Sequence, residues 1–328
     1  MAAPTTTLGP AGPVTGSRSF LARLREGDEI ARLVTFLFAA TVVLITVLLV
    51  YQLWINSVLP RHKFGFHFFV TSVWDPILDE YGALPFIYGT LVTSAVALAI
   101  AVPLGIGAAI FLAELAPPRI SDTLQFFIDL LAAVPSVIYG LLGVFIIVPL
   151  MRTVIAPALI RTLGWIPIFA GPSYGVGFFT AGIVMAIMVI PYIISVSREI
   201  LLSVPRDQRE AALALGSTRW ESTWKVVVPF AKTGIMGSIF LAMARALGET
   251  MAVTMVIGNS PKVAASLFAP GYTIAAVIAN EFTEATGDIY LQSLVYLGLV
   301  LFLLTFLLNG MARLLILATT QRGSKVAA

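Results

Sequence analysis

The residues of this chain that could act on a solute are two opposite charges inside an apolar segment. Arg245 and Glu249 lie four residues apart in the run 233–258, which is otherwise mostly apolar. An arginine near the centre of a membrane helix costs about 2.5–3.5 kcal/mol on insertion scales, so its side chain should face water or the bundle interior. Ser238 falls on the same helical face. The guanidinium suits phosphate-like oxygens, and a nearby carboxylate would keep a bound anion from being held too tightly.

A structural role for the same charges stays open. Arg245 and Glu249 could form an ion pair that only fixes helix packing, although arginine before glutamate is the weaker orientation at this spacing. Ala244 and Gly248 are small residues four apart, a pattern that favours close approach of another helix. That helix could belong to a second subunit or to the core of this chain.

A polar insertion at 203–230 separates two long apolar segments and is the second candidate region. Pro205 suits the first turn of a helix, and the strong helix formers of 206–215 predict that helix. Arg206 and Glu210 are four residues apart and can pair on one of its faces.

The second half of the insertion predicts another short helix. Gly216 is placed where a helix ends in a left-handed turn. Thr218 and Glu221 match a capping box that starts the next helix, and Pro229 closes it before the following span. Such a loop is either an ordinary segment at the lipid headgroups or a docking site for a partner.

Several kinds of chemistry are excluded by the residues that the chain lacks. There is no cysteine, so no thiolate nucleophile or cysteine-ligated metal is possible. The two histidines, His62 and His67, share one loop without a convincing third ligand, so we expect no metal and no cofactor. No GxxxxGK[ST] motif occurs, so any ATP hydrolysis must reside in a partner chain. We expect neither an enzyme nor a nucleic-acid-binding protein.

Composition places the chain among integral membrane proteins. It is 59% hydrophobic and 11% charged, whereas a soluble domain carries roughly 25% charged residues. Long apolar runs predict an all-α fold with six transmembrane helices. These runs cover roughly 33–55, 84–113, 122–150, 177–202, 233–258 and 289–317. Bend points are offered by Pro103, Pro135 and Pro149.

The placement of positive charge predicts the orientation. Most of the twenty lysines and arginines fall in segments on the side of the N-terminus. Positive charge is retained on the cytoplasmic side, so both termini and the insertion should be cytoplasmic.

The spacing within the insertion resembles the coupling loop of ABC importer permeases. Glu-Ala-Ala at 210–212 is followed by Gly216 and then by two aliphatic residues before Pro229. Val226 and Val228 stand where that family usually has Ile and Leu. In that family the loop fits a cleft on an ATPase subunit and carries closure of the ATPase dimer to the spans. The resemblance implies these coupling residues: Arg209, Glu210, Ala211, Ala212 and Gly216.

Three further segments, 131–143, 190–199 and 245–252, are similar to the phosphate permeases of that family. The long loop at 56–83 and the extended N-terminus favour the PstC type over the sister PstA type. The resemblance implies that Arg245 and Glu249 lie on a phosphate path. Weaker candidates for the same path are Thr250, Ser136 and Tyr139.

The fold implied by the resemblance is a MetI-like permease with a five-helix core and an extra N-terminal helix. The expected organisation is a disordered or amphipathic cytoplasmic N-terminus, a first helix with its periplasmic loop, the permease domain and a cytoplasmic tail, at 1–32, 33–83, 84–317 and 318–328.

The function implied is that of half the pore of an ATP-driven phosphate importer in the bacterial inner membrane. Its partners would be a PstA-like permease, two PstB-like ATPases, a periplasmic phosphate-binding protein and membrane lipid.

Three alternatives remain at this point. The chain could be an ABC permease for another solute, such as sulfate, molybdate or an amino acid. It could be an ion-coupled carrier that acts alone, although the docking loop and the lack of an inverted repeat count against that class. It could also be a membrane scaffold that transports nothing.

Overall fold

The computed structural model describes residues 28–324, with side chains for 29–314. Most of the expected N-terminal tail therefore lies outside the described residues, as does the end of the expected C-terminal tail. The described chain is almost entirely helical. Six stretches are long and apolar enough to cross a membrane, which confirms the predicted number. They are Glu29–Ile55, Leu84–Leu115, Ser136–Leu163, Phe178–Leu202, Arg219–Leu247 and Asp288–Leu314.

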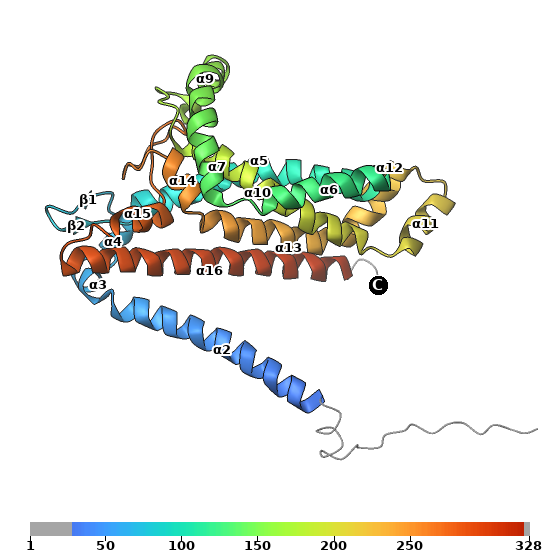
Figure 1. The fold of residues 1–328 in the computed structure, drawn as a ribbon, viewed down its shortest axis with the longest axis horizontal. Helices are drawn as coiled ribbons and strands as arrows, with labels where there is room; N and C mark the ends of the chain where they lie inside the picture. The colour runs from blue at the N-terminus through green and yellow to red at the C-terminus, as the bar shows by residue number, and fades with distance from the viewer. Residues whose placement is uncertain (1–27, 325–328) are drawn as a thin grey trace, which may run out of the picture. The chain divides into compact units, whose positions relative to one another are not determined.

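The elements follow one another as short and long helices around a single strand pair (Figure 1). The long or core helices are α2 (Asp28–Ile55), α5 (Leu84–Ile110), α6 (Pro118–Ala132), α7 (Ser136–Leu142), α10 (Phe178–Leu202), α13 (Val228–Leu247), α14 (Met251–Val256) and α16 (Asp288–Ser324). The short connecting helices are α3 (Val58–Phe64), α4 (His67–Val70), α8 (Val148–Leu150), α9 (Ala156–Leu163), α11 (Arg206–Ala214), α12 (Arg219–Ser222) and α15 (Ile274–Glu281).

Wider, π-helical turns interrupt several helices, and one 3-10 turn lies in a loop. The π turns are η1 (Phe111–Leu115), η2 (Gly143–Ile147), η3 (Met151–Ile155) and η5 (Thr223–Val227), and the 3-10 turn is η4 (Pro167–Phe169). The strands β1 (Trp74–Asp75) and β2 (Glu80–Tyr81) form an antiparallel pair in which Trp74 lies opposite Tyr81.

The chain divides into two units, Met1–Gln52 and Leu53–Ala328. The first unit contains most of α2, whose apolar side chains are exposed along its length. The second unit is built around α10, which contacts α5, α6, α13 and α14. Buried alanines such as Ala97, Ala181 and Ala242 belong to the core there. Small residues let membrane helices approach closely, so this part of the bundle packs around α10.

The third predicted segment, 122–150, is wrong in its bounds, whereas the bend expected at Pro135 is confirmed. The structure ends α6 at Ala132 and begins α7 at Ser136, with Pro135 in an extended conformation between them. Proline lacks the backbone donor and disfavours helical geometry in the residue before it. The helical path then continues through η2 and η3 to Leu163, well past the predicted end, and α9 projects away from the bundle (Figure 1).

The fifth predicted segment, 233–258, is also wrong in its bounds. The second helix of the insertion is not closed by Pro229 but runs through η5 into α13. The π turn explains this, because the Val228 N–H donates to the Thr223 carbonyl and the ladder shifts just before the proline. Pro229 then occupies one of the first two positions of α13, where proline is tolerated. The helix ends at Leu247 and a break at 248–250 leads into α14.

A substitution at Gly89 tests how closely α5 approaches the loop before α15. A methyl group at Gly89 would overlap the backbone oxygen of Tyr272, whereas one at Gly107 on the same helix would meet nothing within 4 Å. We expect Gly89→Ala to destabilise the protein by about 1–3 kcal/mol through overpacking. Gly107→Ala should be neutral or slightly stabilising, because alanine is the better helix former. Thermal unfolding of the purified protein in detergent measures both, and equal melting temperatures would contradict this packing.

Candidate functional site

Arg245 lies in the last turn of α13, because the helix ends at Leu247. The sequence had predicted a position near the centre of a longer helix, and the break at 248–250 explains the difference. The Arg245 side chain is exposed. Its guanidinium carbon lies 5.9 Å from the centre of the Tyr192 ring on α10, within the range of a cation–π contact. Tyr192 was not recognised from the sequence as a partner of this arginine.

Glu249 belongs to the break after α13 and not to the helix itself. Its Oε1 accepts a hydrogen bond of 3.2 Å from the Ala252 N–H in the first turn of α14. Across the described residues, Arg245 and Glu249 form no ion pair within 4.0 Å. The helix ends between them, so the spacing of four no longer places them on one helical face. A direct ion pair that fixes packing is therefore not what the structure shows.

Ser238 does not share the exposed face with Arg245. It is buried against α10, where its hydroxyl lies 2.8 Å from the Ser197 hydroxyl. The pair joins the middle of α13 to α10. The expectation that this face lines water or the bundle interior is met in the second way for Ser238, which is a packing residue.

Tyr139 has a structural partner that explains its place after Pro135. The tyrosine is buried, and its hydroxyl donates a 2.7 Å hydrogen bond to the Leu131 carbonyl. In a continuous helix that carbonyl would accept from residue 135, which is proline and has no N–H. The Tyr139 hydroxyl thus supplies the donor that the proline lacks.

The other two path candidates lie at the ends of neighbouring helices. Ser136 is half-buried at the first position of α7, and Thr250 is half-buried at the start of α14. The two helices pack together, since a methyl group at Gly140 of α7 would lie 3.2 Å from the Ala252 Cα of α14. The Thr250 hydroxyl donates to the Gly248 carbonyl at 3.3 Å within the break.

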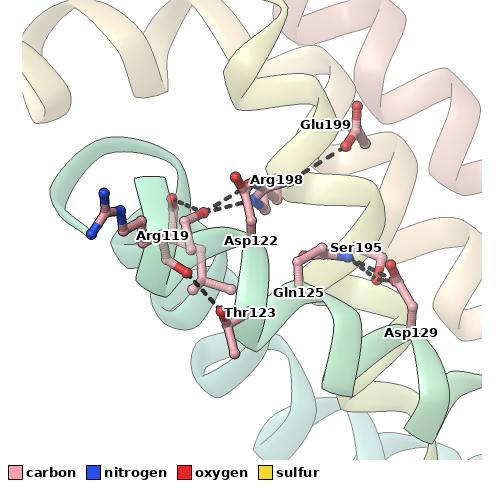
Figure 2. Close-up of polar contacts among 10 residues, drawn as sticks. Arg119, Asp122, Thr123, Gln125, Asp129, Ser195, Arg198 and Glu199 are labelled. Atoms are coloured by element: carbon pink, nitrogen blue, oxygen red, sulfur yellow. Dashed lines mark hydrogen bonds and ion pairs between the residues drawn. The ribbon is translucent and has the colours of Figure 1, made fainter. Parts of the chain in front are cut away.

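Polar contacts hold α6 against α10 (Figure 2). The Arg198 guanidinium donates to the Ser121 hydroxyl and to Asp122, the latter at 3.1 Å, and its side chain is 10% exposed. One turn earlier in α10, the Ser195 hydroxyl donates to Asp129 of α6 at 2.7 Å. The Gln125 amide, also on α6, donates to the same carboxylate at 2.7 Å. These contacts join residues far apart in the sequence and were not predicted from it.

The insertion has the local structure that its sequence predicted at two points. Gly216 has a φ of +86°, the left-handed conformation expected after a helix. The capping box is present, since the Glu221 N–H donates to the Thr218 hydroxyl at 3.3 Å and the Thr218 N–H donates to Glu221 at 3.0 Å. Pro205 is the residue just before α11 and not within its first turn.

The predicted coupling residues differ in exposure. Glu210, Ala211 and Gly216 are exposed, whereas Ala212 is buried. The ion pair expected between Arg206 and Glu210 is not formed among the described residues. Thus most of α11 faces outward.

Arg209 is instead joined to Glu114 of η1. Its guanidinium lies 2.8 Å from a carboxylate oxygen of Glu114, and both side chains are largely buried, at 20% and 10% exposure. Glu114 was not recognised from the sequence. It could have been found as a lone carboxylate at the end of a long apolar run, because a charge in that position needs a partner.

The fold and the sequence together define a class. The family described as "binding-protein-dependent transport system inner membrane component" matches residues 101–320. The fold is similar to a chain of a bacterial ABC transporter that imports alginate, with a TM-score of 0.57, 18% identity, and coverage of 89% of this chain and 98% of that one. It is also similar to a chain of the MetNI methionine ABC transporter, with a TM-score of 0.55, 14% identity, and coverage of 75% and 99%. This is a multi-pass inner-membrane component of an ABC transporter.

Curated relatives narrow the class to one family. The phosphate transport system permease protein PstC of Mesorhizobium japonicum is 48% identical over 263 residues, which cover 79% of this chain and 80% of the relative. PstC of Haemophilus influenzae is 44% identical over 302 residues, covering 91% and 96%. The chain belongs to the PstC family.

Gly216 tests whether the left-handed turn holds α11 in place. No atom lies within 4 Å of a methyl group added there, so any effect of substitution comes from the backbone. The left-handed conformation costs about 1–2 kcal/mol for ordinary residues and less for asparagine. We expect Gly216→Val to fray the end of α11 and speed tryptic cleavage at Arg209 and Arg219 roughly fivefold or more. Gly216→Asn should be cleaved nearly as slowly as the wild type, and equal rates for Val and Gly would contradict this role.

Proposed function

We propose that this chain is the transmembrane permease subunit of an ATP-driven importer of inorganic phosphate, forming half of the pore. Membership of the PstC family supports this, since its curated relatives are named as phosphate transport permeases. The sequence carries no phosphate-binding loop for ATP, so the energy comes from a separate ATPase and the chain itself is not an enzyme.

The assignment of phosphate as the substrate rests on the exposure of Arg245 and on its lack of an ion-pair partner among the described residues. Its side chain is exposed in the last turn of an otherwise apolar helix, and none of the described carboxylates pairs with it. An arginine in this setting is too costly to face lipid, so it faces water or a ligand. Guanidinium offers forked donors that match the oxygens of phosphate. The Glu249 carboxylate, in the break just after α13, would weaken the binding of phosphate enough to allow its release.

The exposed face around Arg245 is where the other half of the pore would be. A methyl group at Gly237 of α13 would meet nothing within 4 Å, Leu241 of the same helix is exposed, and so is Gly248 just after its end. A row of small or open positions lets a second helix approach closely. We assign this face to a PstA-like permease subunit, so that Arg245 borders the path between the two subunits.

The exposed side of α11 supports an ATPase as the partner on the other side of the membrane. Glu210 and Ala211 are exposed, and Leu215 beside Gly216 is 88% exposed. An exposed leucine at a loop tip is typical of a docking surface. Two PstB-like ATPases would bind there and in the sister subunit, and a periplasmic phosphate-binding protein would deliver substrate to the other end. On this proposal both termini are cytoplasmic.

Arg245→Gln tests the phosphate path. We expect the variant complex to assemble normally and its phosphate uptake into proteoliposomes to fall about 100-fold, the cost of losing a hydrogen-bonded charge at the anion. Arg119→Gln is the matched control, since Arg119 is exposed on α6, and Figure 2 draws its guanidinium without a contact. Loss of assembly in Arg245→Gln would assign the arginine to packing instead.

The same preparation separates the rival functions. Uptake of sulfate or molybdate in place of phosphate would indicate a permease for another oxyanion. Solute accumulation driven by an ion gradient, in the isolated subunit and without ATP, would indicate a secondary carrier. Normal flux in Arg245→Gln would favour a scaffold.

Glu210→Lys tests the docking of the ATPase. Glu210 is exposed, so the change should leave the fold intact while reversing charge at the contact. We expect ATP hydrolysis to become insensitive to substrate and phosphate uptake to fall about tenfold or more, as for an interfacial charge whose partner is left facing a like charge. Asp207→Lys on the same helix, also exposed, controls for charge alone. Fully coupled transport in Glu210→Lys would contradict the assignment.

A further inference from the structure

The coupling helix α11 is attached to the rest of the protein by very few side chains. Along Arg206–Ala214, only Arg209 and Ala212 are not exposed. Ala212 offers one methyl group. Beside the backbone at its two ends and its packing against η5, α11 contacts the rest of the protein through the Arg209 side chain.

Arg209 connects α11 to two different elements at once. Its Nε donates to both carboxylate oxygens of Glu114 at 3.2 Å, and its Nη2 donates to Glu114 at 2.8 Å. Its Nη2 also donates to the Leu201 carbonyl at 2.7 Å, and its Nη1 donates to the Val204 carbonyl. Leu201 lies in the last turn of α10, and Val204 lies in the turn between α10 and α11. One guanidinium thus joins α11 to η1 and to α10.

Glu114 is placed by an irregularity of the backbone. It lies in η1, the π turn that ends the second span, where the Ala116 N–H donates to the Phe111 carbonyl at 2.8 Å. A π turn is uncommon and is often found at functional positions. The preceding Leu112 carbonyl accepts a 2.8 Å hydrogen bond from the Ser121 hydroxyl, which itself accepts from Arg198. The backbone segment that carries Glu114 is therefore connected to α5, α6 and α10 together.

Open space lies on both sides of the Arg209–Glu114 ion pair, which is the polar contact between α11 and η1. Glu114 and Arg209 both line a cavity of about 200 Å³, together with Leu213, Arg219, Ser222 and Thr223. Both also line a second cavity of about 370 Å³, on the side of Leu202 and Arg206. The ion pair bridges this space between α11 and η1, while α11 packs against η5 elsewhere.

We propose that the Arg209–Glu114 pair is the joint through which α11 and the second and fourth spans, α5 and α10, move as one body. This rests on the proposed function, in which α11 receives motion from an ATPase. Glu114 is a positioning residue that acts through Arg209 and touches neither substrate nor nucleotide. A two-pronged, largely buried contact suits the role because it resists both rotation and separation.

Glu114→Gln in the assembled transporter is the first test. We expect the complex to form and ATP hydrolysis to continue, while phosphate transported per ATP hydrolysed falls about tenfold or more because the unpaired guanidinium no longer holds α11. Arg209→Lys should act in the same direction, since lysine keeps the charge but loses the fork. Glu199→Gln is the matched control: Glu199 is exposed, lies 3.6 Å from Arg198, and should keep the wild-type ratio. A wild-type ratio in Glu114→Gln would overturn the joint.

A distance measurement distinguishes a joint from a merely stabilising pair. The chain has no cysteine, so spin labels attach only at introduced sites. With labels at Gln208→Cys on α11 and Leu104→Cys on α5, both exposed, the distance should stay constant between nucleotide-free and ATP-bound states. In Glu114→Gln it should change on ATP binding. A change in the wild type, or none in the variant, would overturn the proposal. Failure of the wild type to take up phosphate would instead overturn the proposed function and leave this comparison intact.

Discussion

A polar group inside a bilayer must find a partner in the protein or in water, and this constraint governs where the chain bends and where its charges lie. Pro135 removes a backbone donor from the third crossing, and the Tyr139 hydroxyl replaces it at the Leu131 carbonyl. Pro229 would remove another from the fifth, and the π turn η5 shifts the ladder just before it. The helical path therefore breaks at Pro135, whereas the path from α12 into α13 continues through Pro229.

The same constraint separates three arginines into two kinds. Arg198 and Arg209 are largely buried, and their donors are directed to hydroxyl, carbonyl and carboxylate oxygens. Arg245 is exposed, and its guanidinium lies over the face of Tyr192. Paired and buried charges position helices, whereas an exposed guanidinium retains donors for a ligand. The contrast supports the proposal that Arg245, unlike the other two, lies on the transport path.

How far the sequence predicts this structure depends on the range of the interaction. The number of spans, the Gly216 turn and the Thr218–Glu221 box follow from local composition and short spacings, and the structure confirms them. The break after Leu247 and the extension of the third crossing to Leu163 depend on packing between distant helices, which periodicity does not report. Glu114 and Arg209 are 95 residues apart, so no spacing rule links them. The roles of Arg245 and Glu210 remain predictions.

The two ends of the proposed mechanism are connected by a single helix. Tyr192 of α10 faces Arg245, and the Leu201 carbonyl of the same helix accepts from Arg209. Nine residues of helix separate them, or about 14 Å. Much of α10 is buried against α5 and α13, so it moves as a rigid element. A displacement of α11 held at Arg209 would therefore move the surface that Arg245 contacts, and no flexible segment is needed between the site of energy input and the anion.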